Sequence, residues 1–198
     1  MSQDIKMVAV DIDGTFVHAD YTYDKPRFRR ILSRMNEAGC RFVVASGNQY
    51  YQLRDLFPGY YDELSFVAEN GAFVKDRTEL VFAAEMPDET VNEIIDLCRE
   101  YPEIQNVMCG LESAYCQKGE VDGEFFEKTK IYYHRLKWTD DFKKVKDQIL
   151  KFAPTVPDEK TYYYYDIFRE RLAGKAEPTT SGHGSIDVIL RAVTRRRD

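Results

Sequence analysis

Apolar and polar residues are arranged along the first 70 residues in the way expected of strands and helices in turn. Residues 7–10 (MVAV) form a short apolar run, and residues 24–39 then place apolar side chains at helical spacing before a final glycine. The segments RFVVAS (41–46), QYYQLRDLF (49–57) and LSFVAEN (64–70) continue the series as strand, helix and strand. This alternation predicts an α/β fold with a parallel sheet and right-handed crossovers.

Polar tripeptides follow each of the three predicted strands. They are DID at residues 11–13, SGN at residues 46–48 and ENG at residues 69–71. In open parallel sheets, ligands bind beyond the carboxyl ends of the strands, so the three tripeptides should converge on one site.

The residue types at these strand ends indicate phosphoryl chemistry. Asp11 and Asp13 would repel one another but gain from a bound hard cation such as Mg²⁺, which prefers oxygen ligands and neutralises phosphate. One carboxylate can attack phosphorus, and the other can protonate the leaving oxygen and later activate water. Gly14 permits a sharp turn whose backbone N–H groups can hold phosphate oxygens, and Ser46 is a natural phosphate contact.

Each of these features has an ordinary explanation when it is taken alone. A DxD at a strand end is most often a turn with solvated acids, and SG or NG dipeptides commonly mark loops. Their occurrence at three successive strand ends favours a shared site over coincidence.

Composition narrows the class of protein further. The 198 residues are 43% hydrophobic, which is enough for a substantial core, and the net charge of -6 argues against nucleic acid or an anionic membrane as the main partner. Four cysteines fit neither a zinc pair nor a secreted disulfide framework, and no apolar stretch approaches the roughly 18 residues of a membrane span. We therefore expect a cytoplasmic protein with reduced thiols; the oligomeric state is left open.

The motifs resemble those of a known superfamily. DIDGT is similar to the first motif, DxDGT, of the haloacid-dehalogenase superfamily, and ASGN is similar to its second motif. VVASGNQYYQL, SFVAENGA, CGLESAY, YHRLK, PDE and TSGHGSID resemble the Cof-type branch and, within it, bacterial sugar-phosphate phosphatases. The resemblance extends to about Leu190. It implies a Rossmann-like core with a large α/β cap domain inserted after the third strand and its hairpin.

The same resemblance implies roles for individual residues. Asp11 is the expected nucleophile and Mg²⁺ ligand, and Asp13 is the expected general acid/base and a second Mg²⁺ ligand through its carbonyl. Ser46 contacts phosphate. The remaining assignments are Gly14, Thr15 and Gly47 in the phosphate-binding loops and Asn70 and Gly71 at the rim. His183 is a candidate substrate contact because of its place at the expected hinge and not because of the resemblance; isolated histidines are usually not ligands. The role of Asn48 is left open, because many relatives carry arginine there.

Three regions are expected along the chain: a core over residues 1–83, a cap over residues 84–182, and a return strand with an atypical tail over residues 183–198. Within the cap, residues 88–101 and 139–150 have helical periodicity. Its strand candidates are residues 106–110, 113–117, 149–156 and 182–190. The chain is expected to leave the core near residues 84–87 and to return through glycine hinges at residues 179–184.

The chain departs from the family pattern after Leu190, where it reads RAVTRRRD. Relatives continue with a lysine-bearing third motif and an acidic fourth motif, GDxxND, which completes the Mg²⁺ site. Arg195 stands where that lysine would fall, but its surroundings do not match and it receives no role. We interpret the end as truncated or frame-shifted, which would leave the first strand open on one side.

Two function classes therefore stay open. The first is a Mg²⁺-dependent phosphatase that hydrolyses small phosphorylated metabolites, sugar phosphates above all, through an aspartyl-phosphate. The second is a catalytically impaired fragment or a non-catalytic phosphosugar-binding remnant.

Overall fold

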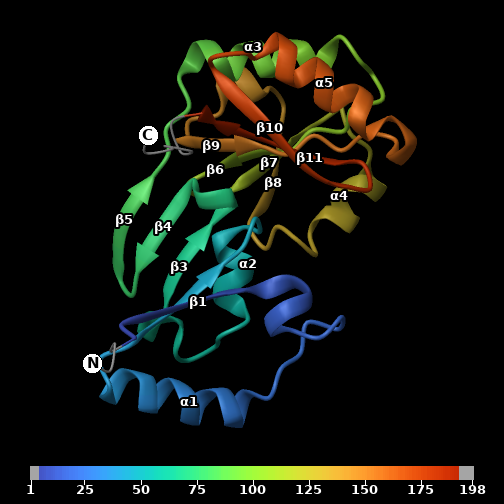
Figure 1. The fold of residues 1–198 in the computed structure, drawn as a ribbon. Coiled ribbons are helices and arrows are strands. Elements are labelled where there is room, and N and C mark those ends of the chain that lie inside the picture. The colour runs from blue at the N-terminus through green and yellow to red at the C-terminus, as the bar shows by residue number, and fades with distance from the viewer. Residues whose placement is uncertain (1–4, 192–198) are drawn as a thin grey trace. The chain divides into compact units, whose positions relative to one another are not determined.

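A computed structural model describes residues 5–191, and the chain divides into two compact units between Phe82 and Ala83. We call them the N-terminal and the C-terminal unit and describe each by itself (Figure 1). The expected border between core and cap, after residue 83, lies one position from this division. The arginine-rich segment 195–197 lies outside the described residues.

The N-terminal unit contains one five-stranded sheet in the order β1-β2-β3-β4-β5. β1, β2 and β3 are parallel, and β4 pairs antiparallel with β3. The predicted strand–helix alternation is therefore confirmed. The elements are β1 (Met7–Asp11), α1 (Lys25–Glu37), β2 (Arg41–Ala45), α2 (Tyr50–Asp55), β3 (Ser65–Ala68), β4 (Phe73–Asp76) and β5 (Glu79–Ala83).

Aromatic side chains hold the two helices of this unit against one face of the sheet. Val44 of β2 is the register partner of Phe66 on β3, so both side chains point to the same face. Phe42 lies on that face too, and its ring centroid is 4.9 Å from that of Phe28 on α1. Tyr50 of α2 lies 5.3 Å from Phe66 by the same measure. Both helices therefore cover the face that carries these buried rings.

Helix α1 shows the local signals on which the prediction rested. The side chain of Asp24 caps its first turn by accepting a hydrogen bond from the backbone N–H of Arg27, and Gly39 follows its end with a positive φ of 66°. Of the predicted apolar face, Phe28 and Leu32 are buried, whereas Ile31 is 43% exposed.

The C-terminal unit contains one six-stranded sheet in the order β10-β11-β9-β6-β7-β8. The pairs are antiparallel except for β7 with β8, which is parallel. The elements are α3 (Asp88–Arg99), β6 (Met108–Gly110), β7 (Ala114–Gln117), α4 (Gly123–Thr129), β8 (Leu136–Thr139), β9 (Ile149–Phe152), α5 (Thr161–Arg171), β10 (Ala176–Gly182) and β11 (Ser185–Leu190).

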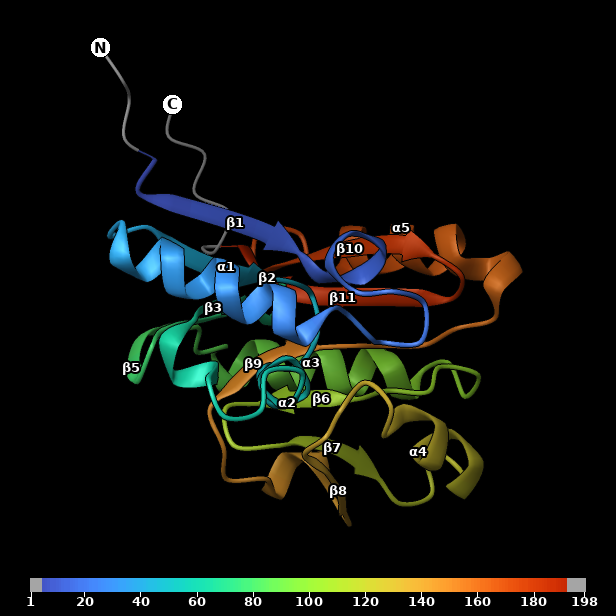
Figure 2. The same cartoon turned by 90° about the horizontal axis from the view of Figure 1, so that it is seen from below.

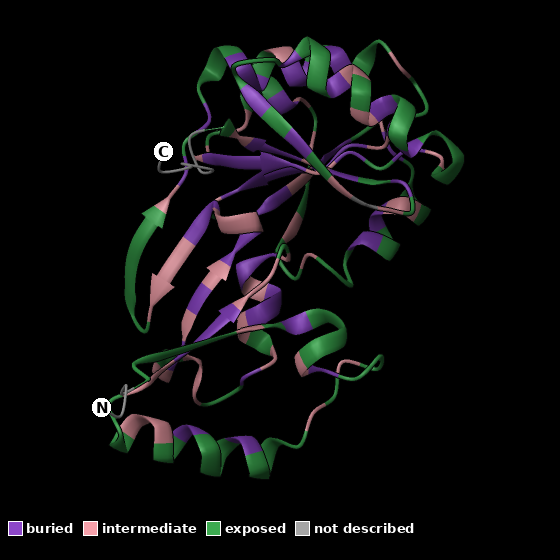
Figure 3. Ribbon diagram, viewed as in Figure 1, coloured by how far each residue is buried: buried purple, intermediate pink, exposed green. Residues whose placement is uncertain are grey.

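The main core of this unit lies between the sheet and two helices. Met108 and Val188 both pair with Phe152, so the three buried side chains share one face. Ile94 of α3 and Phe168 of α5 belong to the same apolar cluster. Figure 1 shows α3 and α5 together on one side of this sheet, and Figure 3 shows its central strands as buried.

The opposite face of the six-stranded sheet is covered in part by α4. Cys109 and Cys116 point into a smaller apolar cluster with Phe126 of α4, whose ring stacks on Trp138 at 4.2 Å between centroids. Beside it, the buried ammonium of Lys151 donates a hydrogen bond to Asp187 at 2.9 Å. Pairing offsets the high cost of burying that charge.

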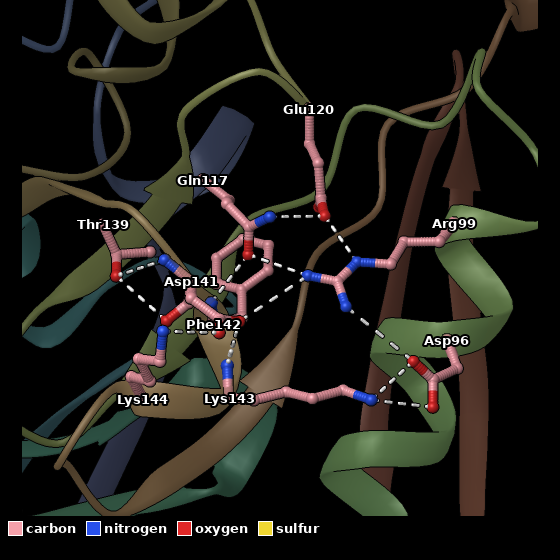
Figure 4. Close-up of polar contacts among 9 residues, drawn as sticks. All are labelled: Asp96, Arg99, Gln117, Glu120, Thr139, Asp141, Phe142, Lys143 and Lys144. Atoms are coloured by element: carbon pink, nitrogen blue, oxygen red, sulfur yellow. Dashed lines mark hydrogen bonds and ion pairs between the residues drawn. The ribbon is translucent and has the colours of Figure 1, made fainter.

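The helix predicted over residues 139–150 is wrong. The structure has the end of β8, a 3₁₀ turn at Phe142–Lys144 and then β9. Long-range polar contacts override the local periodicity: the backbone N–H of Phe142 donates to Gln117 Oε1 at 2.7 Å, and Arg99 donates to the same oxygen at 3.0 Å. Figure 4 shows this network, in which Lys143 also pairs with Asp96. The turn is thereby tied to β7 and α3.

The expected return to the core through residues 179–184 is also wrong. β10 and β11 form an antiparallel hairpin within the six-stranded sheet, with Ala176 opposite Leu190 and Gly182 opposite Ser185. The hairpin turn is His183-Gly184; Gly184 has a positive φ of 74°, and Gly182, which ends β10, has a positive φ of 87°. The glycines that suggested a hinge instead supply the backbone freedom that this tight turn requires. Residues 183–190 therefore belong to the C-terminal unit.

Candidate active site

The carboxyl ends of β1, β2 and β3 meet at one edge of the five-stranded sheet. The register places Asp11 beside Ala45 and Ala45 beside Val67, so the residues that follow each strand begin at the same level. Figure 2, which views the cartoon after a quarter turn, shows β1 and the turn that follows it. The polar tripeptides at these strand ends therefore converge, as their positions in the sequence predict.

The turn after β1 presents two carboxylates on either side of a buried anchor. Ile12 is fully buried, whereas Asp11 and Asp13 are exposed. Gly14 has φ 69° and ψ 1°, a left-handed conformation that favours glycine, and Thr15 follows it as an exposed residue. The backbone N–H of Val17, which is buried, donates a hydrogen bond to the carbonyl of Ile12 at 3.2 Å and so closes the turn.

The loop after β2 faces the first turn and makes direct contact with it. Ser46 Oγ donates to Asp13 Oδ2 at 3.4 Å, and Asn48 Nδ2 donates to the same oxygen at 3.0 Å. Ser46 is fixed through its own backbone N–H, which donates to the carbonyl of Val67 on β3 at 3.0 Å. The second tripeptide therefore reaches the carboxylate of the first, across a sequence separation of 33 to 35 residues.

Gly47 is required by the approach of the third tripeptide. A Cβ built at this position would lie 2.6 Å from Oδ1 of Asn70, far inside van der Waals contact. The Asn70 side chain thus packs directly over the loop that follows β2. Any larger residue at position 47 would displace either this loop or Asn70.

The turn after β3 has an unusual backbone. Glu69, Asn70 and Gly71 have consecutive positive φ values of 52°, 57° and 88°. Residues held in this region are strained, and such strain concentrates at functional sites. The backbone N–H of Glu69 donates to the carbonyl of Asn48 at 3.1 Å, which ties this turn to the second loop.

Two features of the site were not predicted from the sequence. The contact of Asn48 with Asp13 was missed, because an asparagine in a loop carries no sign of its distant partner. Glu69 was noted only as part of its tripeptide, yet only 2% of its surface is exposed. The dipeptide Asn70-Gly71 was the available signal for left-handed backbone at this point.

His183 belongs to the C-terminal unit and not to this group of loops. It lies in the turn between β10 and β11 with φ 56°, and its side chain is 91% exposed. Its Nδ1 atom is 3.5 Å from Oδ2 of Asp158. A contact of His183 with substrate stays a prediction.

The donors at the strand ends fit a magnesium ion. Mg²⁺ is commonly held by one or two carboxylates together with substrate phosphate and water, and the exposed Asp11 carboxylate and the carbonyl of Asp13 are oxygen donors of the kind it prefers. Within residues 5–191, no group of three or more histidine, cysteine or acidic side chains is arranged to hold a metal ion. The described residues therefore fit a site that substrate phosphate and water would complete, and not a closed metal cage.

No helix in residues 5–191 has the length and apolar character needed to span a bilayer. Cys40, Cys98, Cys109 and Cys116 form no disulfide bonds among the described residues.

Comparison with known proteins gives concordant results. A family model described as haloacid dehalogenase-like hydrolase matches residues 8–195. The chain is 37% identical over 189 residues to 5-amino-6-(5-phospho-D-ribitylamino)uracil phosphatase YbjI of Escherichia coli K12, covering 96% of this chain and 69% of that protein. Phosphoglycolate phosphatase 1 of Saccharolobus solfataricus is 32% identical over 99 residues, which are 47% of this chain and 41% of that protein.

Solved structures show the same fold. A crystal structure of a Streptococcus mutans UA159 protein superposes with a TM-score of 0.88 at 30% identity, covering 96% of this chain and 71% of that one. A haloacid dehalogenase-like hydrolase from Bacteroides thetaiotaomicron gives a TM-score of 0.78 at 19% identity, covering 96% and 72%. The chain belongs to the haloacid dehalogenase-like hydrolases of the Cof type, a family whose named relatives here are phosphatases.

Proposed function

We propose that the chain is a Mg²⁺-dependent phosphatase of small phosphorylated metabolites that carry their phosphate on a sugar or sugar-alcohol chain. The observation that carries the proposal is the convergence at one sheet edge of Asp11, Asp13 and the Ser46 hydroxyl. These groups are the nucleophile, the proton donor and the phosphate contact that such a reaction requires.

In the proposed first step, an Asp11 carboxylate oxygen attacks phosphorus. The bond between phosphorus and the ester oxygen breaks, and Asp13 gives its proton to that leaving oxygen. The products are an alcohol and an aspartyl-phosphate on Asp11. In the second step Asp13 removes a proton from water, which attacks phosphorus, releases inorganic phosphate and restores the Asp11 carboxylate.

The other groups hold the phosphate. The Ser46 hydroxyl can turn from Asp13 to a phosphate oxygen, and the backbone N–H groups around Gly14 and Thr15 can donate to others. When bound beside Asp11 and Asp13, Mg²⁺ would neutralise negative charge on the phosphate. The strained turn at residues 69–71 keeps the loop after β2 in position.

The substrate class follows from the relatives and is part of the proposal. The name of the Escherichia coli relative describes a substrate whose phosphate sits on a ribityl chain attached to a uracil ring. We infer a similar phosphorylated polyol or sugar for this chain, with the C-terminal unit acting as the cap that reads the rest of the molecule. Four cysteines without disulfide bonds are consistent with the proposed cytoplasmic location.

A second candidate, catalytically impaired binding of phosphosugars, is favoured by one observation. Within residues 5–191, no group of three or more histidine, cysteine or acidic side chains could hold the proposed metal ion. Loss of a metal-ligating group from a phosphoryl-transfer site costs several kcal/mol of transition-state stabilisation. Weak Mg²⁺ binding and slow turnover are the outcomes that would favour this candidate.

The decisive variant is Asp11→Asn, which replaces the nucleophile with a near-isostere. We expect turnover of p-nitrophenyl phosphate, ribose 5-phosphate and 5-amino-6-(5-phospho-D-ribitylamino)uracil to fall by at least about 1,000-fold with the fold unchanged. Phosphate release is measured with Mg²⁺ and with EDTA, and circular dichroism checks the fold. Asp62→Asn, which alters an exposed carboxylate in the same unit, serves as the control.

The outcomes separate the candidates. Turnover that survives in Asp11→Asn, or that is unchanged by EDTA, contradicts the proposed mechanism. Binding of ribose 5-phosphate by the native chain without any turnover would support the binding function instead.

A further inference from the structure

We propose that Asn48 is a positioning residue that holds the catalytic carboxylate of Asp13 during the reaction; this inference rests on the proposed function. Its Nδ2 atom donates to Asp13 Oδ2 at 3.0 Å, a normal hydrogen-bond length, whereas Ser46 Oγ reaches the same oxygen only at 3.4 Å. Asn48 is therefore the stronger of the two partners of Asp13.

The hydroxyl of Ser46 cannot serve both Asp13 and substrate. It has one proton to donate, and its oxygen already accepts the backbone N–H of Asn48 at 3.1 Å. When that proton is donated to a phosphate oxygen, the contact with Asp13 is lost. Asn48 then remains as the side chain that holds the carboxylate.

The position of Asn48 is fixed from two sides. Its backbone N–H donates to Ser46 Oγ, and its carbonyl accepts the backbone N–H of Glu69 at 3.1 Å. The side chain is partly buried, so little conformational freedom is lost when it binds Asp13. The turn after β3 thus acts on the carboxylate through Asn48.

The charge of the carboxylate determines which end of the Asn48 amide faces Asp13. The amide oxygen of Asn48 would repel the carboxylate, so the amide nitrogen must face Asp13. Both donors approach Oδ2, which leaves Oδ1 as the oxygen that exchanges a proton with the leaving group. An amide provides this hold without adding a positive charge, unlike an arginine side chain at the same position.

The experiment compares Asn48→Ala and Asn48→Leu with the native chain on two substrates. The alkoxide leaving group of ribose 5-phosphate needs a proton from Asp13, whereas p-nitrophenolate leaves without one. The comparison uses kcat/KM, which reports on the steps up to release of the alcohol and not on the later hydrolysis of the aspartyl-phosphate, in which Asp13 serves both substrates as a base. Because general acid catalysis is worth roughly 100- to 10,000-fold, we expect kcat/KM for ribose 5-phosphate to fall by about 10- to 100-fold. For p-nitrophenyl phosphate the loss of kcat/KM should stay within about threefold.

Two controls separate positioning from packing. Asn36→Ala removes an amide that donates to Glu63 at 3.0 Å on the same unit, far along the chain from the site, and should leave both rates unchanged. Leucine keeps the shape of asparagine without the donor. A packing role would make Asn48→Leu mild, whereas a positioning role makes it as damaging as Asn48→Ala.

A double-mutant cycle tests whether Asn48 acts through Asp13. In an Asp13→Asn background, the further change Asn48→Ala should have no additional effect on ribose 5-phosphate turnover. A full additional loss, or an equal loss of kcat/KM on both substrates, would each overturn the proposal.

The hydrogen bond can also be measured without turnover. In the native chain the side-chain amide protons of Asn48 should show a downfield NMR shift that is lost in Asp13→Ala and kept in Asp62→Asn. An unchanged signal in Asp13→Ala would contradict the proposal even if the chain had no activity. A chain that lacks turnover but shows this shift would disprove the proposed function and leave the Asp13–Asn48 contact standing.

Discussion

β1 and β9 differ sharply in how they are packed. β9 lies between β11 and β6, and its four residues are all buried. β1 lies at an edge and, among the described residues, pairs with β2 alone; four of its five residues are exposed. Figure 3 shows the same contrast. The strand that carries Asp11 is thus among the less protected strands described here.

Exposed apolar side chains of the N-terminal unit gather near the two edge strands of its sheet. Interior residues of both units are well buried, so the contrast concerns the edges and not the quality of the whole core. The exposed residues at these edges are Ile5, Met7 and Val8 at β1, and Leu80, Val81 and Phe82 on β5; Ile31 on α1 is exposed as well. Burial of apolar surface is the main stabilising term in folding, so these edges contribute little to it. We infer that the strand that carries Asp11 and the strand at the other edge of its sheet contribute less to stability than the central strands of either unit.

Shortening one phenylalanine at a central position and one at an edge position should give the largest difference in stability. Phe152→Ala empties a fully buried position in the main core of the C-terminal unit and should cost about 3–5 kcal/mol of unfolding free energy. Phe82→Ala removes a ring that is 44% exposed and should cost about 0.5 kcal/mol or less. Phe152→Leu keeps most of the volume and should lose about 1 kcal/mol.

Urea unfolding measures this difference when it is followed by far-UV circular dichroism, which reports on both units, and by fluorescence. Trp138 is the single tryptophan of the chain and stacks on Phe126, so its emission reports on the C-terminal unit. Equal losses of unfolding free energy in Phe152→Ala and Phe82→Ala would contradict the inference that the edge strands contribute little to stability.

Hydrogen exchange should show the same contrast without any substitution. Exchange in edge strands proceeds through small local openings, whereas central strands exchange only in larger ones. We expect peptides that cover β1 to exchange about 100-fold faster than peptides that cover β9. Mass spectrometry of the deuterated native chain measures both. A β1 that is the best protected strand would overturn the comparison.

The first 70 residues were predictable because their signals are local. The apolar runs, the capping residue Asp24 and the polar strand ends are all read within a few residues, and parallel topology then brings Asp11 near Ser46. The direct contacts around Asp13 were not predictable in the same way. They depend on a hydrogen bond to Asn48, 35 residues away, whose geometry no local pattern encodes.

The C-terminal unit was harder to predict because distant residues decide its local structure. Phe142 had helical spacing with its neighbours, yet its backbone N–H is taken by Gln117, 25 residues earlier. The glycines on either side of His183 indicated a break in regular structure. They did not show its kind, because a hinge between domains and a hairpin turn can both use glycines. Only the pairing of β10 with β11 distinguishes the two.

The smallest expected effect concerns thiol reactivity. Cys98, Cys109 and Cys116 are buried in the C-terminal unit, whereas Cys40 is partly exposed in the N-terminal unit. Burial raises the pKa of Cys98 and raises that of Cys116 to about 12. A raised pKa leaves less of the reactive thiolate at pH 8, so these thiols should react slowly.

Labelling with iodoacetamide at pH 8 should therefore modify Cys40 at least about tenfold faster than the other three thiols. Mass spectrometry identifies the labelled residue, and Cys40→Ser should abolish the fast phase. In urea, the three buried thiols should become reactive together, at the concentration where Trp138 emission changes, because both belong to the same unit. Their release at a lower urea concentration would show that the C-terminal unit opens before it unfolds, and the contrast with the edge strands of the N-terminal unit would then fail.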